Sequence, residues 1–232
     1  MLTITVPVRQ VVHATPRTRI LNLDLEATAF HFRAGQALMI GLQGSPLRKP
    51  YSIASAPWEV AKTGVMQVLV QIDDSGALDP HLELAAPGTV LDVEGPFGTF
   101  ELPMDSRPLL FIAGGTGIAP LRSMLMERLL RSGAPRVGLV YSVRVPEELA
   151  FRAELDALQT AGRIAAYFTV TRDNTATWTG RRGRIDRALL QDALPSTDAY
   201  CFVCGPPQLV ADTSGLLRTL GVDESRIQIE KY

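Results

Sequence analysis

The sequence is poor in residues that bind metals or form disulfides. Its 232 residues include two cysteines and three histidines. Two cysteines cannot supply the four thiolates that hold a common iron–sulfur cluster. His13, His31 and His81 are too scattered along the chain to indicate a zinc site. We therefore expect no metal centre, and a protein that exchanges single electrons with this chain must carry its own acceptor.

The two cysteines form a C-x-x-C pattern, Cys201-Phe-Val-Cys204, which is typical of redox motifs and metal sites. Their surroundings, Ala199-Tyr-Cys-Phe-Val-Cys204, are typical of a buried strand. Three strand residues at ~3.3 Å each separate the two Cα atoms by roughly 10 Å and turn the side chains to opposite faces. A disulfide requires Cα atoms about 4.4 to 6.8 Å apart, so the sequence predicts two free thiols.

Long apolar runs and an excess of charge are also missing. No run of 18 apolar residues occurs, and the first residues lack the charged start and apolar core of a secretory signal. The formal net charge of −1 gives no electrostatic reason to expect nucleic acid or an anionic membrane as a partner. We expect a cytoplasmic protein that does not insert into membranes.

The composition, with 46% hydrophobic and 20% charged residues, is typical of a folded globular protein. The length suits two domains of about 100 residues each. Residues 2–100 show short alternating segments between Gly, Pro and Ser turns, a pattern that predicts an antiparallel β-barrel or sandwich. After residues 101–108 strands alternate with helices, which predicts a doubly wound, mostly parallel α/β sheet. We therefore expect domains at 1–102 and 109–232.

The second half can be divided into individual elements. Strands are expected at 109–113, 137–142, 164–170, 199–203 and 227–230. Helices are expected at 121–131, 147–158, 186–193 and 208–220. Chemically distinctive residues follow the strands: glycines at 114–117, a polar segment at 141–144, Thr171-Arg172, Cys204-Gly205 and the terminal 230–232. Because ligands of such sheets bind at the carboxyl ends of the strands, these segments predict a single site.

The most informative segment is Phe111-Ile-Ala-Gly-Gly-Thr-Gly-Ile-Ala-Pro120, a strand that leads into a glycine-rich turn and a helix. Gly114, Gly115 and Gly117 allow backbone N–H groups to approach a ligand closely. The helix that follows adds its unpaired N–H groups and the positive end of its dipole, which favours a phosphate. Glycines at such a turn can equally serve tight packing.

Four motifs in order resemble those of the plant-type ferredoxin–NADP reductase family. Arg48-Lys-Pro-Tyr-Ser resembles its R-x-Y-S flavin motif, and Gly114-Gly-Thr-Gly-Ile-Ala-Pro120 its nucleotide motif. Cys204-Gly-Pro-Pro207 resembles its cysteine-containing turn, and Tyr232 its C-terminal aromatic residue. The resemblance extends over essentially the whole chain and implies a flavin-binding barrel followed by an NAD(P)-binding α/β domain.

The resemblance implies that Tyr51 lies along the flavin ring and that Ser52 hydrogen-bonds near its reactive nitrogen. The family's arginine aligns with Lys49, while Arg48 stands one place earlier, so either side chain could supply the cation for the flavin phosphate. The full set of expected flavin-binding residues is Arg48, Lys49, Tyr51, Ser52, Ser55, Gly76, Ala77, Leu78 and Tyr232.

Asp79 departs from the family, which usually has Ser or Thr at that position. Its carboxylate could cap the following helix, or it could lie near the flavin diphosphate and repel it. The overall resemblance favours FAD, with FMN as the alternative.

The nicotinamide nucleotide is expected at the strand ends. No acid stands in Tyr141-Ser-Val-Arg144, where NAD-preferring dinucleotide folds usually place one. Thr171-Arg172 resembles the family's Ser-Arg pair that holds the 2′-phosphate, so NADPH is favoured over NADH. The expected nucleotide-binding residues are Gly115, Thr116, Gly117, Ser142, Arg144, Thr171, Arg172, Cys204, Gly205 and Pro206.

By the same resemblance the catalytic residues are Ser52, Cys204, Glu230 and Tyr232. Cys204 would border the nicotinamide, Glu230 would support hydride transfer, and Tyr232 would stack on the flavin. The implied activity is transfer of hydride from NAD(P)H to FAD, and then of electrons to a carrier such as ferredoxin or flavodoxin. The alternatives are the reductase component of an oxygenase system, an NAD(P)H:flavin reductase, and an electron-transfer subunit that is inactive alone.

Overall fold

The computed structural model describes residues 2–26, 28–72, 82, 85–130, 137–173, 175 and 177–231. By its internal contacts the chain divides into two compact units. The first comprises Met1–Leu102 together with Arg122–Arg128, and the second comprises Pro103–Leu121 and Leu129–Tyr232. Within the described part of the chain, no helix is both long and apolar enough to cross a membrane.

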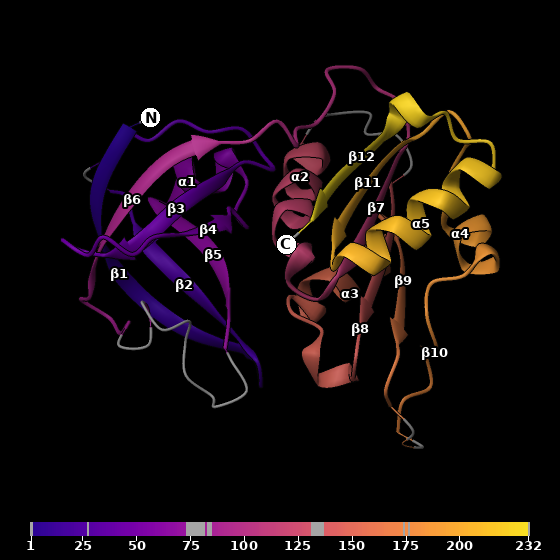
Figure 1. The fold of residues 1–232 in the computed structure, drawn as a ribbon, viewed down its shortest axis with the longest axis horizontal. Helices are drawn as coiled ribbons and strands as arrows, with labels where there is room; N and C mark the ends of the chain where they lie inside the picture. The colour runs from indigo at the N-terminus through magenta and orange to yellow at the C-terminus, as the bar shows by residue number, and fades with distance from the viewer. Residues whose placement is uncertain are drawn as a thin grey trace. The chain divides into compact units, whose positions relative to one another are not determined.

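The first unit contains a nearly closed antiparallel barrel (Figure 1). Its six strands are β1 (Leu2–Thr15), β2 (Thr18–Asp24), β3 (Ala37–Leu42), β4 (Lys49–Ser52), β5 (Val65–Gln71) and β6 (Val90–Phe97). They pair in the order β4-β3-β6-β1-β2-β5. An isolated antiparallel bridge between Ile53 and Val68 links the two edges. Leu21, Leu38 and Leu91 are fully buried in the barrel core.

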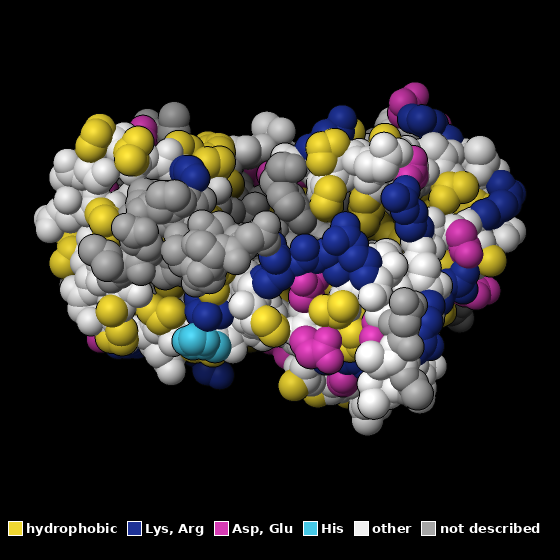
Figure 2. Space-filling view, turned by 60° about the horizontal axis from the view of Figure 1, so that its bottom comes forward, with side chains coloured by type: hydrophobic (Ala, Val, Ile, Leu, Met, Phe, Trp, Pro, Cys, Tyr) yellow, Lys and Arg dark blue, Asp and Glu magenta, His cyan; other side chains and the backbone are white. Residues whose placement is uncertain are grey.

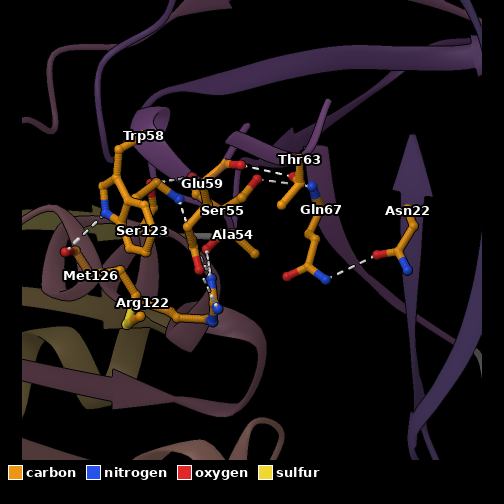
Figure 3. A network of polar contacts seen from close by, with 11 residues as sticks. Asn22, Ala54, Ser55, Trp58, Glu59, Thr63, Gln67, Arg122, Ser123 and Met126 are labelled. Carbon is orange, nitrogen blue, oxygen red and sulfur yellow. Dashed lines mark hydrogen bonds and ion pairs between the residues drawn. The ribbon is translucent and has the colours of Figure 1, made fainter. Parts of the chain in front are cut away.

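A short helix that the sequence analysis did not predict, α1 (Pro57–Thr63), follows β4 closely. The Glu59 carboxylate accepts the Ala56 N–H at 2.7 Å and so closes the first turn of the helix. Helix α1 lies next to a part of α2 (Ile118–Leu130). That part, Arg122–Arg128, belongs to the same unit. The Trp58 indole donates to the Met126 carbonyl at 3.2 Å, as Figure 3 shows.

Arg122 is the centre of this polar network (Figure 3). Its two terminal nitrogens each lie 3.0 Å from one oxygen of Glu59, and Nη1 also donates to the Ala54 carbonyl at 2.8 Å. The side chain of Arg122 is only 6% exposed and that of Glu59 19%. The Ser123 hydroxyl donates to the Ser55 carbonyl at 2.7 Å. The segment that follows β4 is therefore held by a desolvated, bidentate ion pair and several neutral hydrogen bonds.

The second unit contains a six-stranded parallel sheet. Its strands are β7 (Leu109–Gly114), β8 (Val137–Val143), β9 (Ala165–Val170), β10 (Arg181–Arg182), β11 (Tyr200–Gly205) and β12 (Ile227–Lys231), in the order β10-β9-β8-β7-β11-β12. The helices are α3 (Arg152–Thr160), α4 (Arg187–Ala193) and α5 (Pro207–Thr219). Figure 1 shows α4 and α5 on one face of the sheet and α3 on the other. The doubly wound sheet is thus confirmed, and its strand order reverses at β7.

The helix predicted at 147–158 begins later than expected. Pro146–Glu148 form a 3₁₀ turn, and α3 starts only at Arg152. The interruption lies at Phe151, whose φ of 58° is left-handed and cannot continue a right-handed helix. Glu148 is therefore in a tight turn directly after β8.

Candidate functional site

The glycine-rich turn connects β7 to α2 through a 3₁₀ turn at Gly115–Gly117. Gly115 has a φ of 54°, a conformation that glycine adopts without strain. The Tyr141 hydroxyl donates to the Gly115 carbonyl at 3.1 Å and so fixes the turn from the neighbouring strand β8. Pro120 lies in the first turn of α2, as predicted.

Gly117 brings the turn into direct contact with the end of β11. A Cβ atom at this position would lie 2.3 Å from the carbonyl oxygen of Cys204 and 3.0 Å from the nitrogen of Gly205. Because real Cβ atoms do not approach backbone atoms this closely, only glycine fits. The turn and the Cys204-Gly205 segment, predicted separately from the sequence, therefore form one surface at the carboxyl ends of two adjacent strands.

Cys204 and Glu230 are neighbours across β11 and β12, where the strand register pairs them directly. The Cys204 thiol donates to Glu230 Oε2 at 3.7 Å. Cys204 is 2% exposed, whereas Cys201 packs in the apolar cluster on the α4 and α5 side of the sheet. Both thiols are free, as predicted.

Burial decides the protonation of this pair. It raises the pKa of the Cys204 thiol far above its ordinary value, and the adjacent Glu230 charge raises it further. Burial also raises the pKa of Glu230, while the hydrogen bond from Cys204 opposes that shift. Cys204 therefore remains a neutral thiol at neutral pH and is a hydrogen-bond donor rather than a nucleophile.

The segments that follow β8 and β9 continue side by side after the strands end. The Thr171 N–H donates to the Val143 carbonyl at 3.0 Å, and the Arg172 N–H donates to the Arg144 carbonyl at 2.8 Å. The Arg172 side chain is exposed. Among the residues that the structure describes, it has no hydrogen bond or ion pair of its own. On this unit, basic and acidic side chains lie next to one another (Figure 2).

Tyr51 and Ser52 lie on β4, an edge strand of the barrel, where they pair with Leu38 and Ala37 of β3. Both side chains are half-buried, and Tyr51 packs against the barrel core. An aromatic ring supported from behind in this way can present its other face to a flat π-system. The arrangement fits the flavin role that the resemblance implied.

Arg48 is placed differently from its neighbours. Its guanidinium lies 3.3 Å from Asp92 and 3.2 Å from Glu94, both on β6. The Gly44 N–H, then the Thr5 hydroxyl and Arg48 itself, lower the pKa of Asp92, so this carboxylate is firmly ionised. Two carboxylates therefore already balance the charge of Arg48. Lys49, the next residue, is exposed.

Ser55 does not have the position expected of a flavin ligand. It is 2% exposed, and its hydroxyl accepts the Gln67 N–H at 2.9 Å. Its carbonyl accepts from Ser123. Ser55 joins the end of β4 to β5 and α2, and this burial weighs against its assignment to the flavin site, which stays a prediction. Gly76, Ala77, Leu78, Asp79 and Tyr232 lie outside the described residues.

Sequence reasoning missed several polar residues that the structure places close to the predicted site. Glu148 binds the Arg144 guanidinium directly after β8, although no acid stands within 141–144. Arg122 and Glu59 form the buried pair that follows the flavin motif. Within the described ranges, no group of three or more His, Cys, Asp or Glu side chains is placed to hold a metal ion.

Comparisons with known proteins agree with this geometry. Residues 5–102 match the oxidoreductase FAD-binding domain, and residues 111–215 match the oxidoreductase NAD-binding domain. Ferredoxin–NADP reductase B of Sorangium cellulosum is 33% identical over 235 residues, covering 94% of this chain and 93% of its own length. The chain belongs to the ferredoxin–NADP reductase family. As a member of this family it is an FAD- and NAD(P)-binding oxidoreductase.

Other relatives of this ferredoxin–NADP reductase family member act in oxygenase systems. The 2-halobenzoate 1,2-dioxygenase electron transfer component of Burkholderia cepacia is 31% identical over 204 residues, and the match covers 87% of this chain but 59% of the relative. The structure of the Amycolatopsis cytochrome P450 reductase GcoB has a TM-score of 0.85 at 26% identity, covering 99% of this chain and 69% of the other.

Proposed function

We propose that this chain transfers hydride from NADPH to bound FAD and then passes electrons to a small carrier protein such as ferredoxin or flavodoxin. The observation that carries the proposal is the Cys204–Glu230 pair beside Gly117. A neutral thiol and a half-buried carboxyl group thus lie at the carboxyl ends of β11 and the edge strand β12, on the side where this class of sheet binds its ligands.

The two cofactors supply hydride and single-electron chemistry, and the protein orients them and excludes water. Cys204 would place a neutral sulfur atom at the nicotinamide site without introducing a negative charge. Its single thiol hydrogen is donated to Glu230 Oε2, which fixes the thiol rotamer. The Gly115–Gly117 turn offers backbone N–H groups to the dinucleotide phosphates.

On the barrel, Tyr51 would support the flavin ring, and Ser52 would donate a hydrogen bond to its reactive nitrogen. We assign the flavin phosphate to Lys49, because it stands at the position of the family's arginine and its side chain is exposed. A purified protein should therefore be yellow and contain about one flavin per chain. Chromatography of the released chromophore identifies it, and a colourless protein that neither FAD nor FMN restores would contradict the assignment.

NADPH is favoured over NADH because Arg172 is exposed and follows β9 directly. A charge-assisted contact to the 2′-phosphate contributes about 1.5 to 3 kcal/mol. Arg172→Ala should therefore lower kcat/KM for NADPH by roughly ten- to a hundredfold and leave NADH use nearly unchanged. Arg184→Ala removes another exposed arginine and serves as the control. Equal losses with both nucleotides would refute the assignment.

The Burkholderia and Amycolatopsis relatives favour a second candidate, the reductase of an oxygenase system. An isolated chain that oxidises NADPH with ferricyanide is an autonomous reductase, whereas inactivity would indicate a subunit that requires a partner. Reduction of ferredoxin and flavodoxin, compared with that of free FAD and FMN, then separates carrier reduction from flavin reduction. Preference for free flavin would reject the carrier proposal.

A further inference from the structure

An ion pair between Arg144 and Glu148 spans the turn that follows β8. Glu148 accepts from Arg144 through Nε at 3.1 Å, through Nη2, and through the backbone N–H at 3.3 Å. The side chain of Glu148 is 15% exposed and that of Arg144 37%. The 3₁₀ turn at Pro146–Glu148 folds the carboxylate back onto the arginine. One edge of the Arg144 guanidinium fork is thus occupied by a partly desolvated carboxylate.

This pair stands directly beside Arg172. The Arg172 N–H donates to the Arg144 carbonyl, so the two arginines start from hydrogen-bonded positions on neighbouring strand ends. One is held by a carboxylate, and the other is exposed. Together, the side chains of Arg144, Arg172 and Glu148 carry two positive charges and one negative charge.

The two nicotinamide nucleotides differ only in the group on one ribose hydroxyl, and Glu148 discriminates between those groups on physical grounds. A 2′-phosphate is an anion that would be repelled by the carboxylate and would compete with it for the N–H groups of Arg144. A free 2′-hydroxyl is a donor that an ionised carboxylate accepts well. In dinucleotide folds an acid near this strand end holds the ribose hydroxyls.

We propose that Glu148 is a specificity-determining residue that weakens binding of the 2′-phosphate and strengthens binding of the unphosphorylated ribose. Glu148 acts partly by occupying Arg144. This inference rests on the proposed function, because it requires a nicotinamide nucleotide at the ends of β8 and β9. The competing explanation is that Glu148 only caps the 145–149 turn and has no influence on nucleotide choice.

The test measures binding of 2′,5′-ADP and 5′-AMP to the flavin-loaded full chain by calorimetry. Glu148→Gln removes the charge but keeps an acceptor for the Arg144 N–H. The matched control is Glu224→Gln, which changes net charge equally. Glu224 pairs with Arg218 just before β12, at the opposite edge of the sheet. Flavin content and circular dichroism verify that each variant folds.

We expect Glu148→Gln to raise the affinity ratio of 2′,5′-ADP to 5′-AMP on the order of tenfold, which is about 1.4 kcal/mol. Glu224→Gln should leave the ratio unchanged. In an Arg144→Gln background the effect of Glu148→Gln should become smaller, because part of it acts through Arg144.

Three results would separate failure of the inference from failure of the function. If the wild type prefers 2′,5′-ADP and Glu148→Gln leaves the ratio unchanged or lowers it, Glu148 is only a structural residue and the inference is wrong. If the wild type prefers 5′-AMP and Glu148→Gln reverses this, the inference stands and the choice of NADPH is wrong. If neither compound binds, the nucleotide site itself is refuted, and the inference with it.

Discussion

Replacing Arg122 should destabilise the first unit more than removing one partner of an exposed ion pair does. In Arg122→Met the Glu59 carboxylate would lose both guanidinium contacts and keep the Ala56 N–H. The Ala54 carbonyl would also lose its donor. Breaking a buried pair by removing one partner costs about 3 to 5 kcal/mol, because the remaining charge stays desolvated. With side chains 6% and 19% exposed, this pair should lie within that range.

The second substitution tests the cause of that loss. Glu59→Gln in the Arg122→Met background removes the unpaired negative charge of Glu59 and keeps an oxygen that can accept the Ala56 N–H. The double variant should therefore recover roughly 1 to 2 kcal/mol relative to Arg122→Met alone. Such a recovery shows that the uncompensated charge contributes to the destabilisation, in addition to the lost packing of the arginine stem and the lost hydrogen bond to Ala54.

Urea unfolding followed by tryptophan fluorescence can measure both effects. The chain has two tryptophans, so a Trp178→Phe background leaves Trp58, which contacts Met126 of α2, as the reporter. Arg9→Met serves as the control in the same unit, because the side chains of Arg9 and its partner Glu26 are 39% and 63% exposed and an exposed pair contributes little. The reasoning is refuted if Arg122→Met costs no more than Arg9→Met, or if the double variant is no more stable than Arg122→Met.

Three further predictions concern the second unit. Gly117→Ala should lower the free energy of unfolding by about 1 to 3 kcal/mol and abolish 5′-AMP binding, because the new Cβ would lie 2.3 Å from the Cys204 carbonyl oxygen. An unchanged Tm together with unchanged 5′-AMP affinity in calorimetry would contradict this. Burial raises the pKa of Glu230 above its usual 4.5, so stability contributed by the protonated group is lost as pH rises through the folded-state pKa. Glu230→Gln should therefore gain more stability over wild type at pH 8 than at pH 4.5, and a constant difference in Tm would refute the shift. The Leu189 N–H, then Arg181, lower the pKa of Asp186 below 3.8, so its cap stabilises the fold above that pH and is lost in acid. Asp186→Ala should lower the free energy of unfolding, measured by urea titration, by about 1 kcal/mol at pH 7 and by less below pH 3. Asp186→Asn should leave it nearly unchanged. An equal loss for Asp186→Ala at both pH values would argue against the cap.

The sequence predicted elements well where one signal dominates. Five strands of the parallel sheet are short runs rich in apolar residues between turn residues, and each of these was predicted within a few residues. The sixth strand, β10, was missed because it consists of two arginines. The helix at 147–158 was misplaced because its charged residues suit a helix, while the left-handed Phe151 is set by tertiary structure. The helix α1 was missed because seven residues in a turn-rich region show too little periodicity.

The site was predictable where the strand order creates it. Cys204 and Glu230 follow adjacent parallel strands, so their pairing follows from register. The ion pairs of Arg48 could not be predicted from the sequence, because its partners Asp92 and Glu94 lie far along the chain. Glu148 had a local signal in the sequence, because it stands four residues after Arg144 across Pro146, but the prediction was confined to residues 141–144.

The discontinuity of the first unit has a consequence for biosynthesis. The ribosome completes Leu102 before it has made Arg122–Arg128, which the unit includes. At roughly 5 to 20 residues per second, the stretch from Leu102 to Arg128 takes about 1 to 5 s to synthesise. During that interval the nascent barrel must keep Glu59 and the carbonyls of Ala54 and Ser55 hydrated, because the residues that bind them do not yet exist. The flavin-binding half of the chain therefore cannot finish folding until the helix that follows the glycine turn has been translated.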